Sequence, residues 1–275
     1  LTDPYYAPYT NFVRQAEGRV STVTLDPERD FEPRVEDFAA AVDEETVAML
    51  LNSPQNPTGA VMSGETIAEL VDLAERTDTR IISDEIYHGL AFDAEEHSVL
   101  EYTDEAYVLD GVSKRYGMTG WRLGWAVVPP GEVDAFNKLV QNVLICAPNF
   151  VQDGARAAIE TEPSWLDDVR ETYRERRDLL LEAAERWGLD MGYTPAGAYY
   201  LLLDVSDLPG DAFDVADVFL EDANVAMTPG PDFGEQATDT LRASFATSTE
   251  EIEKAIDRLD DLLAEYAAET HLSRS

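Results

Sequence analysis

Short, unbroken apolar runs alternate with helical patterns in the first half of the chain. Residues 64–78 carry apolar Ile67, Leu70, Val71 and Ala74 at the spacing of one helix face. Runs predicted as strands occupy 46–52, 80–83, 106–110 and 122–129. Runs without polar alternation are typical of strands flanked by helices on both faces of a parallel sheet. The pattern therefore predicts an α/β domain with a mainly parallel sheet.

The second half has a different order of elements. A long helix is predicted over 164–188, with Ser164 and Asp167 as a capping box and Gly188 at its end. The elements predicted after it are a strand over 197–205, a helix over 211–222, a strand-like segment over 224–230, a strand over 240–247 and a helix over 249–267. We therefore expect a large domain over 1–165 and a smaller C-terminal α+β domain over 166–275.

The chain is strongly acidic. It has 56 Asp+Glu against 20 Lys+Arg, a formal net charge of −36, and only three lysines. The acids are spread through helical segments such as 211–223. Because such a surface repels phosphate and anionic lipid, nucleic acid and membranes are poor partners. Abundant acid with little lysine resembles the surface of proteins from salt-loving organisms.

This acidic surface predicts that salt stabilises the fold. Like charges repel one another in dilute buffer, whereas a Debye length of about 3 Å at 1 M salt screens them. We expect the melting temperature to rise between low and molar KCl, as measured by circular dichroism. A melting temperature that stays flat or falls over that range would rule out adaptation to salt.

Other features of the composition concern location. The 275 residues, 44% of them hydrophobic, are enough to bury a large core. No run approaches the roughly 20 apolar residues of a membrane helix, and the opening LTDPYYAPYT lacks the regions of a signal peptide. Cys146 is the single cysteine, so no internal disulfide can form. These features favour a reducing cytoplasm.

Polar side chains gather just past the predicted strands of the first domain. In strand order they are Asn56, Asp84, Tyr87, Ser113 and Lys114. The carboxyl ends of strands in an open α/β sheet form the edge where ligands bind. We therefore expect these side chains to converge on one cleft.

These side chains, together with Arg122, suit one kind of ligand. A sheltered lysine amine can form a Schiff base with an aldehyde, and an aspartate can pair with a protonated pyridine nitrogen. Tyrosine and asparagine can hydrogen-bond a phenolate oxygen, and an arginine fork can hold a phosphate. Aldehyde, pyridinium, phenolate and phosphate together describe pyridoxal 5′-phosphate.

Five blocks of sequence occur in order across nearly the whole chain. They are 54-PQNPTG-59, 83-SDEIYHGLAF-92, 113-SKRYGMTGWRLG-124, 195-PAGAYY-200, and 226-AMTPGPDFG-234 followed by 241-LRASFA-246. In kind, order and spacing they resemble the class I/II aminotransferases, which are fold-type I pyridoxal-phosphate enzymes. The resemblance implies a homodimer that moves an amino group between an amino acid and a 2-oxo acid by a ping-pong Schiff-base mechanism.

The resemblance also implies catalytic roles. Lys114 matches the Schiff-base lysine, which carries the proton between the substrate Cα and the cofactor C4′. Asp84 matches the carboxylate that keeps the pyridine nitrogen protonated and so makes the ring an electron sink. Tyr87 and Asn56 match the partners of the ring hydroxyl.

Binding roles follow in the same way. Arg122 matches a phosphate ligand, and Tyr6 matches the aromatic residue that stacks on the cofactor ring. Arg242 matches the arginine that clamps the substrate α-carboxylate, a bidentate task for which lysine is poorly suited. Asn56 is expected beside the substrate as well.

The chain departs from the family pattern in two places. Gly111 stands where many relatives have a serine that helps to hold the phosphate, and the role of Ser113 is left open. The family also has an N-terminal part before the position of Leu1, which supplies a phosphate-cradling helix and a tyrosine for the partner subunit. The chain is therefore expected to be a truncated product or a fragment.

Simpler explanations stay open at this point. Lys114 could be a solvated loop lysine, Asp84 a turn cap, and Arg242 the solvent-facing residue of an alternating strand. A pyridoxal-phosphate lyase would use the same lysine and aspartate, and a truncated chain could be a non-catalytic remnant. No metal site is predicted, because the histidines show no ligand spacing.

Overall fold

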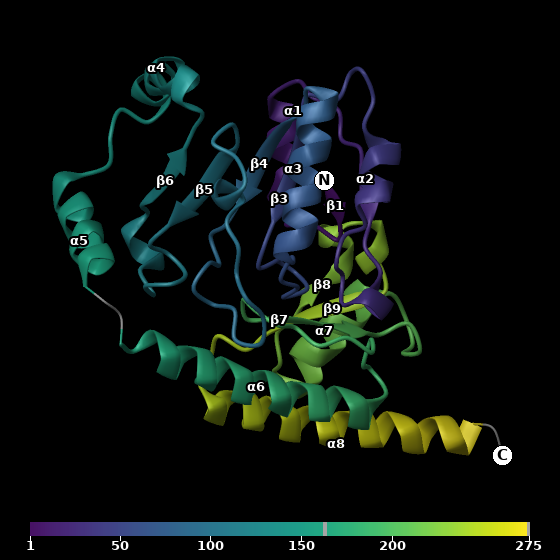
Figure 1. The fold of residues 1–275 in the computed structure, drawn as a ribbon. Helices are drawn as coiled ribbons and strands as arrows, with labels where there is room; N and C mark the ends of the chain where they lie inside the picture. The colour runs from purple at the N-terminus through teal and green to yellow at the C-terminus, as the bar shows by residue number, and fades with distance from the viewer. Residues whose placement is uncertain (162–163, 274–275) are drawn as a thin grey trace.

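The computed structural model describes residues 1–161 and 164–273, whose elements form three sheets and the helices around them (Figure 1). The strands are β1 (Thr2–Asp3), β2 (Val23–Thr24), β3 (Ala48–Asn52), β4 (Arg80–Asp84), β5 (Tyr107–Gly111), β6 (Gly124–Val127), β7 (Tyr200–Asp204), β8 (Thr228–Pro229) and β9 (Thr240–Ser244). The helices are α1 (Pro8–Gln15), α2 (Val35–Ala41), α3 (Gly64–Thr77), α4 (Val133–Val143), α5 (Asn149–Glu160), α6 (Leu166–Trp187), α7 (Ala212–Ala223) and α8 (Thr249–Ser273).

The largest sheet has the order β3-β4-β5-β6. Strands β3, β4 and β5 pair in parallel, with Asn52 opposite Asp84 and Asp84 opposite Leu109. Strand β6 runs antiparallel to β5. The apolar runs thus predicted the positions of these strands and a mainly parallel sheet. They carry no information on the direction of the edge strand.

Helix α3 covers one face of this sheet. Ser63 caps its first turn by accepting from the Thr66 backbone N–H. Its apolar face packs with strand residues such as Met49 and Ile81 in one buried cluster. On the opposite face Ile82 is only half-buried, and Leu109 is 38% exposed. The expectation of helices on both faces therefore holds for only one face within the described part of the chain.

The second half builds an antiparallel sheet in the order β7-β9-β8. Leu203 and Leu241, which pair across β7 and β9, are fully buried in its core, together with Phe219 of α7. Helices α6 and α8 lie side by side beneath the sheet in the view of Figure 1. Arg242 is half-buried on the other face of β9, where its side chain points into the cleft described below.

Of the two predicted ends of α6, the C-terminal one is confirmed and the N-terminal one is not. Gly188 ends the helix in the left-handed region at φ 73°, as expected. The predicted capping box is wrong: Trp165 is the N-cap and makes no side-chain cap bond, and Asp167 instead accepts from Arg170 at 2.7 Å. The domain division near residue 165 stays a prediction.

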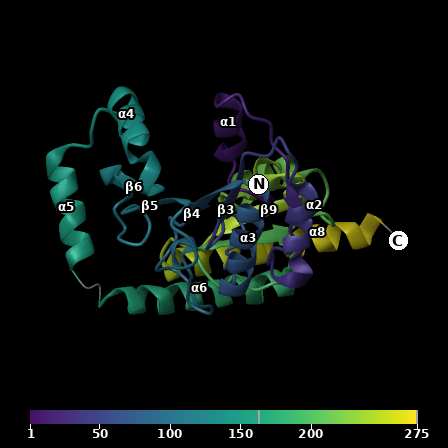
Figure 2. The same cartoon turned by 45° about the horizontal axis from the view of Figure 1, so that its top comes forward.

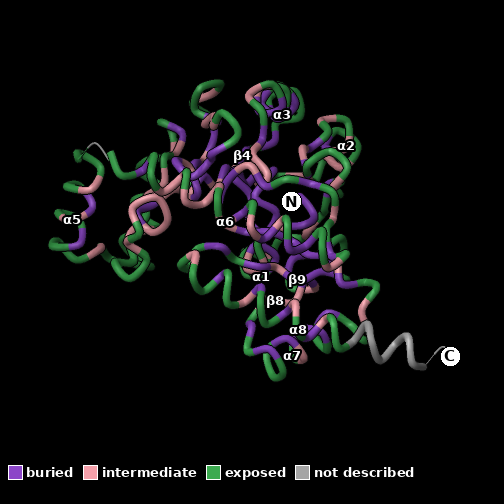
Figure 3. The backbone as a smooth tube through the Cα atoms, turned by 90° about the horizontal axis from the view of Figure 1, so that it is seen from below, coloured by how far each residue is buried: buried purple, intermediate pink, exposed green. Residues whose placement is uncertain are grey.

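Helices α4 and α5 stand at one side of the chain, away from the C-terminal sheet (Figures 1 and 2). Helix α4 has no buried residue, and α5 buries only Val151 and Ala155. Figure 3 shows α5 as a mostly exposed arm. The helices of the described ranges include none that is long and apolar enough to cross a membrane.

Candidate active site

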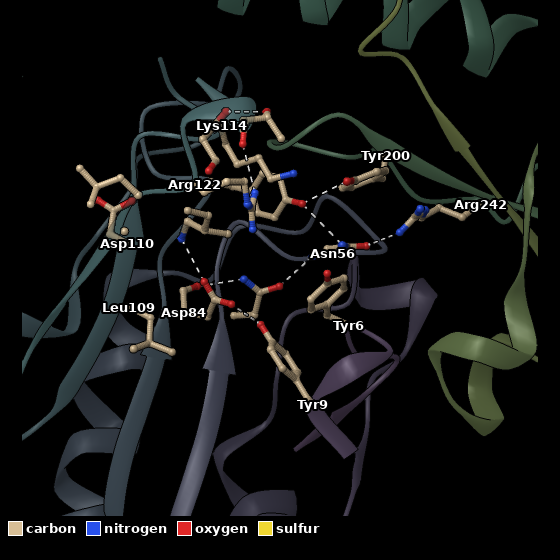
Figure 4. Close-up of a pocket in the computed structure, with 17 residues that line it drawn as sticks. Tyr6, Tyr9, Asn56, Asp84, Leu109, Asp110, Lys114, Arg122, Tyr200 and Arg242 are labelled. Atoms are coloured by element: carbon tan, nitrogen blue, oxygen red, sulfur yellow. Dashed lines mark hydrogen bonds between the residues drawn. The ribbon is translucent and has the colours of Figure 1, made fainter. Parts of the chain in front are cut away.

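The carboxyl ends of β3, β4 and β5 border a cleft of about 560 Å³, a size usual for small-molecule sites. All of the site residues predicted from the sequence line it: Tyr6, Asn56, Asp84, Tyr87, Ser113, Lys114, Arg122 and Arg242. Figure 4 shows the labelled members converging on one space from both sheets. The geometry brings them together, whereas their chemical roles stay predictions.

The strand ends are tied together by Asn52, a cleft residue that the sequence patterns did not single out. Its side-chain N–H donates to the Asp84 carbonyl at 2.9 Å, and its side-chain oxygen accepts from the Asn56 backbone N–H at 2.9 Å. Asn52 thus fixes the loop after β3 against β4. This contact sets the position of Asn56 relative to Asp84.

Two of the sequence blocks pack directly on one another. Gly59 has φ 73°, and a Cβ there would lie 2.7 Å from Pro195 Cβ. A Cβ on Gly197 would lie 2.9 Å from Pro54 Cβ. Only glycine fits at either position, so the 54–59 loop and the 195–200 segment can approach closely. This approach brings Tyr200, the first residue of β7, to the cleft.

The Asp84 carboxylate is held by two donors. One oxygen accepts from the Tyr9 hydroxyl at 2.6 Å, and the other accepts from the Ile86 backbone N–H at 3.1 Å. Burial raises the pKa of Asp84, while these two hydrogen bonds and the charge of Lys114 act in the opposite direction. Burial and the charge of Asp84 raise the pKa of Tyr9, so that Tyr9 is a neutral donor.

Asp84→Asn should stabilise the ligand-free chain at neutral pH. Because the pKa of Asp84 in the fold lies above its ordinary value of 3.8, the folded state favours the protonated acid. The resulting contribution of Asp84 to the free energy of unfolding is present below pH 3.8, and it is lost as the pH rises through the raised pKa. Asparagine does not ionise, so it avoids this loss. Urea unfolding should show an advantage for the variant that grows toward pH 7; equal stability at every pH would contradict this expectation.

Lys114 follows β5 and faces aromatic rings. Its Nζ lies 5.4 Å from the centroid of the Tyr87 ring and 5.6 Å from that of Tyr199. Within the described ranges the amine forms no ion pair. An amine placed on aromatic faces in a cleft is available to react with a carbonyl carbon.

The phosphate-binding candidates lie on the turn between β5 and β6. Arg122 adopts the left-handed region at φ 53° and donates to the Thr119 carbonyl at 3.1 Å. A Cβ on Gly111 would lie 2.8 Å from the Leu123 carbonyl oxygen, so a side chain there would require this turn to shift. Ser113 and Thr119 both bring a hydroxyl of this turn to the cleft.

The guanidinium of Arg242 is held by polar and aromatic neighbours. Nη1 donates to Asn56 Oδ1 at 2.8 Å, and Nη2 donates to Thr228 Oγ1 at 3.2 Å. Its Nε is buried and has no partner among the described residues. Since the guanidinium has five N–H groups, several remain for a carboxylate.

Tyr6 and Tyr9 come from the segment before and within α1. Their rings meet edge to face with centroids 5.4 Å apart. Tyr6 is 39% exposed at the mouth of the cleft, which leaves its ring accessible to a flat ligand. Within the described ranges no group of three or more His, Cys, Asp or Glu residues could hold a metal ion.

Comparison with known proteins identifies relatives that match nearly the whole chain. The family model "Aminotransferase class I and II" matches residues 1–259. An aspartate/prephenate aminotransferase of Thermus thermophilus is 36% identical over 267 residues, which are 96% of this chain and 68% of the relative. A probable aspartate aminotransferase of Methanocaldococcus jannaschii is 33% identical over 95% of this chain and 70% of its own length.

Solved structures agree with the sequence comparison. The aromatic aminotransferase of Pyrococcus horikoshii superposes with a TM-score of 0.91 at 30% identity, over 97% of this chain and 73% of that one. A mutant aspartate aminotransferase of Thermus thermophilus gives a TM-score of 0.88 at 36% identity, over 94% of this chain and 71% of that one. The comparison of sequences and the comparison of folds therefore both give aminotransferases.

Proposed function

Since the chain belongs to the class I and II aminotransferase family, we propose that it exchanges an amino group between an amino acid and a 2-oxo acid with pyridoxal 5′-phosphate as its cofactor. The observation that carries this proposal is the convergence of Lys114, Asp84 and Arg242 on one cleft. These residues come from segments far apart in the chain. The lyase alternative is not favoured, because the relatives described above are aminotransferases.

The donor set of the cleft fits the cofactor. Asp84, already fixed by two donors, would face the ring nitrogen, and the hydroxyl of Tyr87 with the amide of Asn56 would bind the ring hydroxyl. Lys114 would present its amine to the aldehyde. This amine forms no ion pair with the described residues. When bound, the cofactor supplies an aldehyde and an electron-withdrawing ring that stabilises negative charge at the substrate Cα.

Arg122, Ser113 and Tyr6 would complete the cofactor site. Arg122 and Ser113 lie together on the β5–β6 turn, where a guanidinium and a hydroxyl suit a phosphate. Tyr6 presents an exposed ring that suits stacking on a flat heterocycle.

Lys114 and Arg242 would act on the substrate. The free amine of Lys114 would remove the proton from the substrate Cα and deliver it to the cofactor C4′, a general acid–base role. Arg242 would grip the α-carboxylate with the N–H groups that Asn56 and Thr228 leave free. The carboxylate end would thus be fixed while the lysine moves the proton.

We also propose a setting for the enzyme. The homodimer implied by family membership would place this cleft near a partner subunit. The single cysteine favours the cytoplasm, and the charge of −36 favours a salt-rich one.

Cofactor binding is the direct test. Titration of the purified chain with pyridoxal 5′-phosphate in molar KCl should give a saturable change of absorbance. Borohydride, which makes a lysine–cofactor bond permanent, should then attach the cofactor to the peptide that contains Lys114. The exposed Lys254, which pairs with Glu251, is the matched control, and Lys254→Ala should label as the wild type does.

Two outcomes would contradict the proposal. One is the absence of saturable binding, which would favour a non-catalytic remnant. The other is labelling spread over several lysines and unchanged in Lys114→Ala, which would indicate adventitious reaction of the aldehyde with surface amines.

A further inference from the structure

Tyr200 is a cleft residue without an assigned role, and it contacts two of the residues assigned above. It is the first residue of β7 and is only 7% exposed. Its hydroxyl oxygen lies 3.1 Å from that of Tyr87, in a hydrogen bond that either group can donate. Its ring centroid lies 4.3 Å from Arg242 Cζ. One side chain thus contacts the carboxylate-binding arginine through its ring and the cofactor-binding tyrosine through its hydroxyl.

These contacts belong to a closed circuit of four residues, Arg242, Asn56, Tyr87 and Tyr200, of which Figure 4 labels all but Tyr87. Arg242 donates to Asn56, and the Asn56 amide donates over a long 3.5 Å to the Tyr87 hydroxyl. The Tyr87 hydroxyl forms a hydrogen bond with the Tyr200 hydroxyl, and the Tyr200 ring contacts the Arg242 guanidinium. The circuit joins the end of the cleft that would hold the substrate carboxylate to the end that would hold the cofactor ring hydroxyl.

Proton counting fixes the direction of the central hydrogen bond when a ligand is present. Tyr87 has one hydroxyl proton. If that proton is donated to the ring hydroxyl oxygen of the cofactor, Tyr200 must supply the proton of the Tyr87–Tyr200 bond. A hydroxyl that accepts a hydrogen bond becomes a stronger donor, because bonds in a chain polarise one another.

The ring of Tyr200 has a separate effect. A cation on an aromatic face is attracted by the ring quadrupole, and the attraction is larger where water is excluded. Phe233 provides a second ring, with its centroid 4.6 Å from Arg242 Cζ. The two rings restrict the guanidinium without using any of its N–H groups, so that these stay free for a carboxylate.

We infer that Tyr200 is a positioning residue with two separable tasks: its ring orients Arg242 for the substrate carboxylate, and its hydroxyl strengthens Tyr87 as a donor to the cofactor. This inference rests on the proposed function. It predicts that the two tasks are lost in different variants. Tyr200→Phe removes the hydroxyl and keeps the ring, whereas Tyr200→Leu removes both.

The test uses the cofactor-loaded chain and two binding readouts. One is the pH midpoint of the cofactor absorbance change, which reports on how well the ring oxygen anion is stabilised. The other is the Kd of propionate, a probe with one carboxylate and no amine, measured from difference spectra. Neither readout depends on turnover.

Tyr200→Phe should raise the pH midpoint by roughly half a unit, because a weaker donor at Tyr87 stabilises the oxygen anion less. It should leave the Kd of propionate within about two-fold of the wild type, because the ring is still present. Tyr200→Leu should raise the Kd of propionate by about 5- to 30-fold, because one desolvated cation–aromatic contact is lost.

Tyr173→Phe is the matched control. Tyr173 belongs to the same aromatic cluster, with its ring 5.7 Å from that of Tyr199. Its hydroxyl makes no hydrogen bond to the other residues of the described ranges. Loss of this hydroxyl should move neither readout, which separates the specific effect of Tyr200 from a general loss of polarity.

The outcomes distinguish this inference from the proposed function. An unchanged pH midpoint in Tyr200→Phe overturns the hydroxyl task. A Tyr200→Leu variant that still binds the cofactor and has the propionate affinity of the wild type overturns the ring task. If Tyr200→Leu fails to fold, a tenfold higher Kd in Tyr200→Phe would overturn the ring task in its place. Absence of cofactor binding by the wild type would overturn the proposed function itself.

Discussion

Replacement of Lys114 by alanine should lower kcat by about 10⁴-fold, which is the upper range for the loss of a positioned acid–base group. The reason is that the cleft offers no substitute amine: its other cations, Arg122 and Arg242, are guanidiniums, which do not lose a proton near neutral pH. The rate of 2-oxo acid formation from an amino acid with an added 2-oxo acid acceptor, in molar KCl, is the measurement.

The control for this loss is Lys254→Ala, which removes one of the three lysines from an exposed position on α8. It should keep the activity of the wild type. Circular dichroism of Lys114→Ala should show an intact fold, since Lys114 forms no ion pair with described residues that its loss would break. Activity of Lys114→Ala within tenfold of the wild type would show that another base moves the proton.

Much of the large sheet was predictable because its signals are local. The apolar runs of β3, β4 and β5, and the helical spacing of α3, lie within single segments. The capping box of α6 was predicted wrongly: with Trp165 as the N-cap, Asp167 is not at the third helical position, and its carboxylate accepts from Arg170. A motif of two residues at fixed spacing does not determine which residue becomes the N-cap or which partner the carboxylate binds.

The cleft was predictable to the extent that its residues lie in the five blocks. These blocks predicted the family and the fold type, and both are confirmed by the match over residues 1–259 and by the solved relatives. The close approach of the Leu123 carbonyl oxygen to Gly111 is a tertiary contact that the sequence does not show.

Tyr9 and Tyr200 were missed because their significance lies in tertiary contacts. Tyr9 bonds Asp84 across 75 positions of sequence, and Tyr200 bonds Tyr87 across 113. Both lie inside or beside the tyrosine-rich segments 4-PYY-6 and 195-PAGAYY-200. A tyrosine in such a segment is equally compatible with a packed core, and no spacing rule distinguishes a buried ring from one whose hydroxyl contacts a carboxylate.

Arg242→Leu should lower kcat/KM for amino-acid substrates by about 10³-fold, because two charge-assisted hydrogen bonds to a carboxylate are lost together. Arg242→Lys keeps the charge and loses the planar fork, so we expect it to lie between the wild type and the leucine variant. Titration with pyridoxal 5′-phosphate should still saturate in both variants, because Asp84, Lys114 and Arg122 would remain in the cleft.

The pattern of these losses matters more than their size. Arg76 is an exposed arginine in the last turn of α3, and Arg76→Leu controls for the removal of a guanidinium alone. If Arg242 binds the substrate carboxylate, the leucine variant should lose its sensitivity to propionate as an inhibitor along with its kcat/KM. If the leucine variant lost activity but were still inhibited by propionate, the carboxylate would bind to a different group. Arg242 would then serve to position its neighbours Asn56 and Tyr200 in the cleft.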